Sequence, residues 1–203
     1  MVIEENGKRI MTDPGSYTDG QFKEKNIDLI LITHEHPDHF HLDSLKKVLV
    51  NSPNATIITN TSVGKFLTEA KITHAILEDK QCKEFSGIYL EAHGNEHAFI
   101  RSSIPVVQNT GYFIGRDLFY PGDAFTNPKK LVRILALPVA APWLTIQDVL
   151  QYVKEVNPKI AFSVHDGMLN EFGLGYVKKV IPEILKSFGI SFVIPEIGKE
   201  ENL

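Results

Sequence analysis

Residues 34–41 read His-Glu-His-Pro-Asp-His-Phe-His, and they contain four of the eight histidines of the chain. Neutral imidazole nitrogens and ionised carboxylates are the ligands that zinc and other borderline divalent metals prefer. Such a cluster would repel itself if it were fully protonated, so a bound cation explains it better than a polar turn does. The octapeptide therefore predicts a metal site, with enough donors for more than one ion.

The first two histidines of the octapeptide follow a predicted strand. Residues 27–33 (Ile-Asp-Leu-Ile-Leu-Ile-Thr) form an apolar run that is typical of a strand buried on both faces. Alternate residues of an extended chain point to the same side. His34 and His36 are therefore expected to bind one ion together.

The second half of the octapeptide turns into a predicted helix. Asp38 and His39 follow Pro37 at this turn. A helix N-terminus lowers the pKa of an adjacent histidine, which favours the neutral form that binds metal. Asp38 and His39 are therefore expected to face a second ion. His41 lies further along and is expected to support the ligands rather than to bind metal.

Further donors are expected from loops elsewhere in the chain. His165 lies in Ser-Val-His-Asp-Gly, and the octapeptide favours it as a ligand over a hydrogen-bonded strand-end histidine. His97 follows a Gly-Asn-Glu turn and can project from a loop, so it is favoured over His93, which ends a strand. Asp123 follows Pro-Gly and is the candidate carboxylate that bridges two cations, although such an Asp also suits a turn or a helix N-cap. All these candidates lie near the carboxyl ends of predicted strands, where neighbouring loops can pool their donors.

Three more residues have roles that the sequence leaves open or assigns to packing. Asp13, in Thr-Asp-Pro-Gly, either accepts a hydrogen bond from a ligating imidazole or forms a turn. His74, in Ile-Thr-His-Ala-Ile, is expected to be a satisfied structural residue. Residues 137–143 are expected to border the site as an apolar wall, but plain packing is favoured for Trp143 itself.

The composition is that of an ordinary globular protein. The 203 residues are 43% hydrophobic and 23% charged, and they most simply form one domain that spans residues 1–203. The net charge of -4 argues against a nucleic-acid partner, which usually requires a basic stripe. Cys82 is the only cysteine, so the chain is expected to be reduced and cytoplasmic. No apolar run reaches membrane-spanning length, and no secretory pattern begins the chain, so no membrane partner is expected.

Apolar, β-rich runs alternate with amphipathic helical patterns, which indicates an α/β protein with mixed sheets flanked by helices. Residues 84–122 contain several short strands and no helix, which predicts an antiparallel meander. The predicted strands are residues 9–12, 27–33, 55–59, 88–92, 98–101, 111–114, 118–120, 132–139, 159–164 and 190–194, and the first two predicted helices are residues 42–50 and 62–71.

The last quarter of the chain has the clearest pattern of alternating helix and strand. Thr145 and Asp148 predict a capping box at the start of a helix that ends before Pro158. A final helix is expected to end near Gly189, a residue type that suits the left-handed conformation after a helix. Pro182 is expected to kink or break that helix.

With these residues in place, the chain resembles the metallo-β-lactamase superfamily over nearly its whole length. The superfamily's signature H-x-H-x-D-H is highly specific, and it matches the octapeptide. The matching residues are His34, His36, Asp38 and His39, then His97, Gly122-Asp123 and His165, together with an early Asp13-Pro-Gly. The resemblance implies a four-layer αβ/βα sandwich with a dinuclear site at one edge. It also implies the ligand sets: His34, His36 and His97 for the first ion, Asp38, His39 and His165 for the second, and Asp123 as the bridge.

Within the superfamily, the chain is most similar to the small, single-domain metal-dependent hydrolases, a branch that includes ascorbate-6-phosphate lactonase-like proteins. It departs from the thiolesterase and glyoxalase II-type members, because Gly-Asn-Glu-His-Ala replaces their G-H-T-x-G around the third histidine. Members usually carry one more strand before the Glu-Asn-Gly hairpin. Either the chain is truncated, or the first sheet has a bare edge that would favour pairing with a second copy in a homo-oligomer.

The resemblance implies a hydrolase with two Zn²⁺ ions, with Mn²⁺ or Fe as alternatives. A hydroxide bridged by the two ions would attack an ester, lactone or amide of a small molecule. Asp38 would be the catalytic residue that orients this nucleophile and carries a proton to the leaving group. The alternatives left open are a phosphodiesterase or nuclease, an iron-dependent redox enzyme, and a non-catalytic metal-binding protein.

Overall fold

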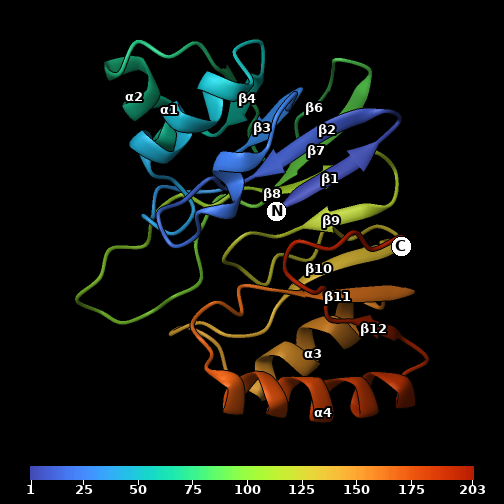
Figure 1. The fold of residues 1–203 in the computed structure, drawn as a ribbon. Helices are drawn as coiled ribbons and strands as arrows, with labels where there is room; N and C mark the ends of the chain where they lie inside the picture. Colours follow the sequence, from blue (N-terminus) through green and yellow to red (C-terminus); the bar gives the residue numbers. More distant parts are fainter.

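The computed structural model describes residues 1–203, and the first part of the chain forms a five-stranded sheet (Figure 1). Its strands are β1 (Val2–Glu5), β2 (Lys8–Thr12), β3 (Leu29–Leu31), β4 (Thr56–Thr59) and β5 (Ala75–Ile76), in that spatial order. β1 and β2 form an antiparallel hairpin, and every other neighbouring pair is parallel. The connections contain the short 3-10 helix η1 (Gly20–Lys23) and the helices α1 (Leu42–Asn51) and α2 (Thr61–Glu69).

The rest of the chain forms a seven-stranded sheet. Its strands are β6 (Cys82–Phe85), β7 (Ile88–His93), β8 (Gly111–Ile114), β9 (Leu118–Tyr120), β10 (Ile134–Pro138), β11 (Ile160–Val164) and β12 (Ser191–Val193). Their spatial order follows the sequence order, with antiparallel pairing from β6 to β9 and parallel pairing from β9 to β12. Two longer helices, α3 (Ile146–Val156) and α4 (Glu171–Ser187), connect the parallel strands.

The two sheets pack face to face, and a pair of helices covers the outer face of each (Figure 1). The alternation of side chains along β3 explains this layering, because successive residues of a strand point to opposite faces. Ile30 packs with Leu45 of α1 on the helical side. Leu31 packs with Leu90 and Tyr112 of the second sheet. Both faces of β3 are therefore buried, as its continuous apolar sequence predicts.

Most of the predicted architecture is confirmed. The fold is an α/β sandwich with mixed sheets flanked by helices, and residues 84–122 contain the antiparallel meander. The capping box of Thr145 and Asp148 is present, and Gly189 has the left-handed φ of 75° after α4. No helix combines the length and the apolar character that crossing a lipid bilayer requires.

Some predicted elements were wrong. Residues 98–101 form no strand: their alternating sequence has no neighbouring strand to pair with, and the side chain of Phe99 is exposed. α4 continues through Pro182, so that proline does not break the helix. The sequence reasoning also missed three short strands, β1, β5 and β6, of which β1 lies at a sheet edge and pairs with β2 alone.

The direction of the strands determines where their following loops meet. The strands β7, β9, β10 and β11 run parallel to one another, so their carboxyl ends lie at one edge of the second sheet. β2 and β3 are likewise parallel in the first sheet. The loops that follow these strands carry the candidate ligands, and they meet at one end of the sandwich, at the left of Figure 1.

Candidate metal centre

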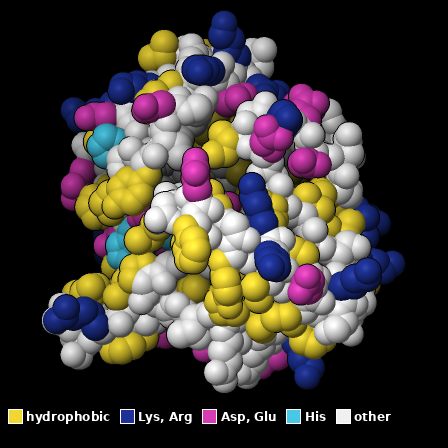
Figure 2. Space-filling model, turned by 60° about the horizontal axis from the view of Figure 1, so that its bottom comes forward, with side chains coloured by type: hydrophobic (Ala, Val, Ile, Leu, Met, Phe, Trp, Pro, Cys, Tyr) yellow, Lys and Arg dark blue, Asp and Glu magenta, His cyan; other side chains and the backbone are white.

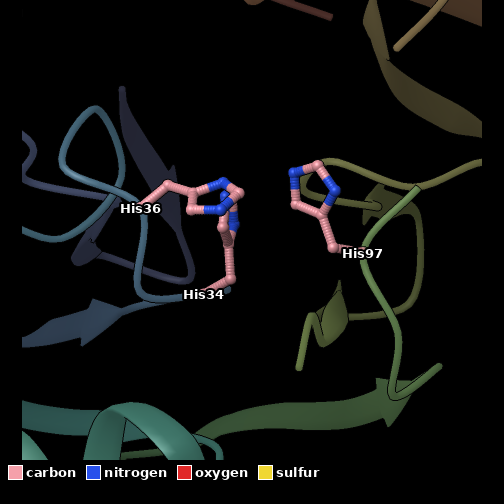
Figure 3. Close-up of side chains that lie close together, drawn as sticks. All are labelled: His34, His36 and His97. Atoms are coloured by element: carbon pink, nitrogen blue, oxygen red, sulfur yellow. The ribbon is translucent and has the colours of Figure 1, made fainter. Parts of the chain in front are cut away.

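Three imidazoles converge from the two sheets. His34 and His36 follow β3, whereas His97 comes from the loop after β7, and their rings face one another (Figure 3). Their ring centroids lie 4.6 to 4.9 Å apart. One nitrogen from each ring lies within 4.8 Å of the other two, so the three residues can hold one metal ion.

A second group of donors lies beside the first. It consists of Asp38, His39 and His165, whose potential ligand atoms also lie within 4.8 Å of one another. The Nε2 atom of His165 is 3.4 Å from Oδ2 of Asp38, and Nε2 of His39 is 3.7 Å from the same oxygen. This mixed set of two imidazoles and a carboxylate suits a second divalent ion.

Asp123 lies between the two groups, in the loop after β9. Its Oδ1 atom is 3.2 Å from Nε2 of His39, and its Oδ2 atom is 3.2 Å from Nε2 of His165. The same Oδ2 atom is 3.5 Å from Nε2 of His97. The carboxylate therefore contacts imidazoles of both groups, which is the position that a bridging ligand requires.

Backbone carbonyls orient two of the imidazoles. Nδ1 of His97 donates to the carbonyl oxygen of Ala98 at 2.6 Å, and Nδ1 of His165 donates to that of Ala140 at 2.6 Å. With the proton held on Nδ1, each ring presents Nε2 to the centre as an acceptor. The geometry therefore selects the tautomer that binds metal through Nε2.

Asp13 orients a third imidazole. Its Oδ2 atom accepts a hydrogen bond from Nδ1 of His39 at 2.8 Å and another from the hydroxyl of Tyr120 at 2.6 Å. Its two oxygens also accept hydrogen bonds from the backbone N–H and the hydroxyl of Thr33. That hydroxyl in turn lies 3.0 Å from Nδ1 of His34. Of the two roles left open for Asp13, the structure has the hydrogen bond to a candidate ligand.

Several atoms that point into the centre have no hydrogen-bond partner. They are Nε2 of His34, His97 and His165, together with Oδ1 of Asp123, and all of them are buried. Buried polar atoms are almost always hydrogen-bonded, because leaving one unpaired costs roughly 1–3 kcal/mol. A cluster of such unpaired acceptors fits metal ions, which would satisfy all of them at once.

The electrostatics of the centre point the same way. Burial, and next the charge of His39, hold the pKa of His34 well below its usual value. Burial lowers the pKa of His39 as well, but the Asp123 and Asp13 carboxylates outweigh it and raise this pKa to about 10. Burial is likewise outweighed at His165, where the carboxylates of Asp123 and Asp38 raise the pKa to about 11. The buried carboxylates thus demand positive charge, which divalent cations supply.

Two glycines allow the loops to approach one another. A Cβ atom on Gly15 would lie 1.9 Å from the carbonyl oxygen of Asp38, so only glycine lets the loop after β2 pass the octapeptide. Gly122 has a φ of 65°, and a Cβ atom there would lie 2.4 Å from Oδ1 of Asn109. That same oxygen accepts a hydrogen bond from the backbone N–H of Asp123. Glycine at position 122 is therefore needed to place this carboxylate.

The remaining histidines lie outside the centre. His93 pairs with Glu91 at 3.1 Å, which agrees with the preference for His97. His74 lies 2.9 Å from the backbone oxygen of Ile72, as expected of a satisfied structural residue. His41 precedes α1, and its Nδ1 atom lies 2.9 Å from the hydroxyl of Ser44.

Trp143 is the contact that sequence reasoning missed. Its indole Nε1–H donates a hydrogen bond of 2.9 Å to Oδ2 of Asp123, so the preference for plain packing was wrong. The segment before it does border the centre, because the carbonyl of Ala140 holds His165. The only signal in the sequence for this contact is that an indole N–H removed from water usually needs an acceptor. The sequence did not identify which residue that acceptor is.

Fold and site together define an α/β-sandwich protein with a candidate dinuclear metal centre at one edge. The sequence model of the family described as "Beta-lactamase superfamily domain" matches residues 1–165. The chain belongs to this superfamily, the metallo-β-lactamases.

Sequence relatives agree with this assignment, and a solved structure shares the fold. The chain is 30% identical to Protein Rv0786c of Mycobacterium tuberculosis over an alignment of 174 residues, with 83% of this chain and 81% of the relative covered. It is 36% identical over 192 residues to a protein of Staphylococcus saprophyticus named UPF0173 metal-dependent hydrolase, with 81% of each chain covered. The crystal structure of a putative metal-dependent hydrolase from Parabacteroides distasonis has the same fold, with a TM-score of 0.77, 24% identity, and coverage of 96% of this chain and 88% of that one.

Proposed function

We propose that this metal-dependent hydrolase of the metallo-β-lactamase superfamily binds two divalent cations, expected to be Zn²⁺ with Mn²⁺ or Fe as alternatives, and cleaves an ester, lactone or amide of a small molecule. The position of Asp123 is the observation that carries the proposal, because its two oxygens reach imidazoles of both donor groups. The proposed ligands are His34, His36 and His97 for one ion, and Asp38, His39 and His165 for the other, with Asp123 as the bridge.

The bound cations would supply an acidified water as the nucleophile at neutral pH and would polarise the oxygen of the scissile bond. The two carboxylates differ in exposure to solvent: the side chain of Asp38 is 25% exposed, whereas that of Asp123 is 6% exposed. Of these two carboxylates, only Asp38 therefore combines contact with the centre and access to an incoming substrate. We assign Asp38 the role of orienting the attacking water and moving its proton to the leaving group.

The remaining residues of the centre act by holding positions. Ala140 and Asp13 keep His165 and His39 in their tautomers through the hydrogen bonds of 2.6 and 2.8 Å. Trp143 fixes the orientation of Asp123 by its hydrogen bond to Oδ2. Such supporting contacts typically change metal affinity or activity by 10- to 100-fold when they are removed.

A panel of chromogenic substrates tests the proposal. Zinc-loaded protein is assayed with p-nitrophenyl esters, lactones, anilides and bis-p-nitrophenyl phosphate, before and after treatment with EDTA. The proposal expects hydrolysis of an ester, lactone or amide that EDTA abolishes and zinc restores. Asp38→Asn should lower kcat at least about 100-fold, because general acid–base catalysis contributes about 10²- to 10⁴-fold.

The matched control is Asp43→Asn, since the Asp43 side chain is 74% exposed on α1. This variant should keep the wild-type kcat. Turnover of the phosphodiester alone would assign a different reaction to the centre. Two bound ions without turnover of any substrate class would favour a metal-binding protein whose ions brace the fold.

A further inference from the structure

An apolar groove lies against the metal centre. It has a volume of about 520 Å³ and runs between the loop that follows β10 and the first turns of α4. The loop contributes Val139, Pro142 and Leu144, and the other wall contributes Met168, Phe172 and Tyr176. No charged side chain lines the groove, so it cannot pair with an anionic or cationic group of a ligand.

The groove and the centre share structural elements. Ala140 lines the groove, and its carbonyl oxygen accepts the hydrogen bond from Nδ1 of His165. Trp143 lies between the lining residues Pro142 and Leu144 in the sequence, and it donates to Asp123. A ligand that fills the groove therefore lies against the loop that orients His165 and carries Trp143.

The outer wall of the groove exposes large apolar side chains to water. Met168 is 59% exposed, Phe172 is 87% exposed and Tyr176 is 50% exposed. Met168 lies just before α4, and the other two lie in its first two turns. Contiguous apolar patches of this kind mark sites where a ligand or partner binds. Figure 2 shows hydrophobic side chains gathered around a hollow in which histidine and acidic side chains are visible.

We propose that this groove binds the apolar chain of the substrate, so that the substrate is an ester, lactone or amide with an alkyl or acyl chain of several carbons. The inference rests on the proposed hydrolase function. The volume falls within the range of small-molecule pockets, roughly 300–1,000 Å³. A second copy of this protein is the competing occupant. Because the groove shares a loop with the metal centre, a second copy bound there would cover the centre.

The single tryptophan gives a test that does not depend on turnover, since Trp143 lies between the lining residues Pro142 and Leu144 in the sequence and donates to Asp123 of the centre. Zinc-loaded protein is titrated with straight-chain carboxylates from acetate to decanoate, below their micelle concentrations, while the fluorescence of Trp143 is recorded. The carboxylate head group is constant along this series, so differences in Kd measure the contribution of the alkyl chain to binding. The proposal expects Kd to fall roughly fourfold for each added methylene, since each buried CH₂ contributes about 0.8 kcal/mol.

Two substitutions localise the effect. Met168→Glu puts a charge into the wall of the groove and should flatten the dependence of Kd on chain length. Leu131→Glu is the matched control, because Leu131 is 78% exposed in the segment before the amino end of β10, at the opposite edge of the sheet. This control should keep the wild-type dependence.

A parallel series of p-nitrophenyl esters separates the two proposals. Hydrolysis of the esters with no dependence of Kd or kcat/KM on chain length overturns the groove proposal and leaves the hydrolase standing. Chain-length-dependent binding that Met168→Glu removes, without hydrolysis of any ester, lactone or amide, supports the groove and overturns the hydrolase. Light scattering tests the second copy. If the protein is a dimer that Met168→Glu dissociates, and Kd does not depend on the length of the alkyl chain, the groove binds a second copy and the proposal is overturned.

Discussion

The indole Nε1–H of Trp143 donates a hydrogen bond of 2.9 Å to Oδ2 of Asp123. The two residues lie on different loops, and the contact fixes the rotation of a carboxylate that also reaches the imidazoles of His97 and His165. Trp143→Phe keeps an aromatic ring but removes the donor. We expect it to weaken binding of at least one ion about tenfold, as loss of a supporting hydrogen bond usually does. A competition titration with a coloured chelator measures the metal affinity. Wild-type affinity in the variant would contradict a role for Trp143 in orienting Asp123.

Asp13 is expected to act on the second ion through His39, because its Oδ2 atom accepts a hydrogen bond of 2.8 Å from Nδ1 of that imidazole. Asp13→Asn should lower the affinity for one of the two ions by 10- to 100-fold and leave the other within a few-fold. The matched control is Asp117→Asn, because Asp117 pairs with Arg133 at 3.1 Å on the surface and is 52% exposed. Isothermal titration with Zn²⁺ resolves the two binding steps. Equal weakening of both steps would mean that Asp13 serves the whole fold rather than one ligand.

Gly15 should be required for the packing of its loop against the octapeptide. A Cβ atom at this position would lie 1.9 Å from the backbone oxygen of Asp38, so Gly15→Ala forces the two loops apart. We expect a loss of about 2–3 kcal/mol in the free energy of unfolding, in the range of severe overpacking. Gly20→Ala is the control, since nothing lies within 4 Å of a Cβ atom there. Urea unfolding measures both, and equal stability of the two variants would contradict the close approach.

The pH dependence of stability should include a contribution from Asp28, far from the metal centre. The hydrogen bond from Lys8, at 2.8 Å, and next that from the backbone N–H of Arg9 hold the pKa of Asp28 below its usual value. A carboxyl with a lowered pKa stabilises the fold above its unfolded pKa of about 3.9, and this contribution is lost as the pH falls through the folded pKa.

Asp28→Asn tests this sign. We expect the variant to lose about 1 kcal/mol of stability at pH 7, and we expect the difference from the wild type to close below about pH 4. Urea unfolding in the presence of EDTA, repeated from pH 7 downward, measures the difference without a contribution from bound metal. A difference that stays constant with pH would mean that the amide loses packing rather than charge.

Local sequence pattern was sufficient to predict many of the side chains that gather in the candidate centre. The apolar run before the octapeptide indicates a buried strand, and the spacing of His34 and His36 places two donors on one side of the chain that follows it. His165 and Asp123 also follow predicted strands, and parallel strands bring such loops to a common edge. These inferences need only strand direction and residue type.

Contacts between distant loops could not be predicted in this way. The partners of Asp13 include Tyr120, which is 107 positions away, and the hydrogen bond from Trp143 to Asp123 depends on how two loops fold over each other. The wrong strand at residues 98–101 has a related cause. Its alternating pattern suits a strand, but pattern alone does not say whether a neighbouring strand is available to pair with it.

Metal content distinguishes a carboxylate-bridged pair of cations from a single metal site. Wild-type protein, loaded with Zn²⁺ and passed through a desalting column, is analysed by mass spectrometry of its metals beside the Asp123→Ala variant. Asp123 contacts imidazoles of both donor groups, so we expect two ions per wild-type chain and at most one in the variant. Two ions retained by the Asp123→Ala variant, or a single ion in the wild type, would contradict a carboxylate-bridged pair of cations.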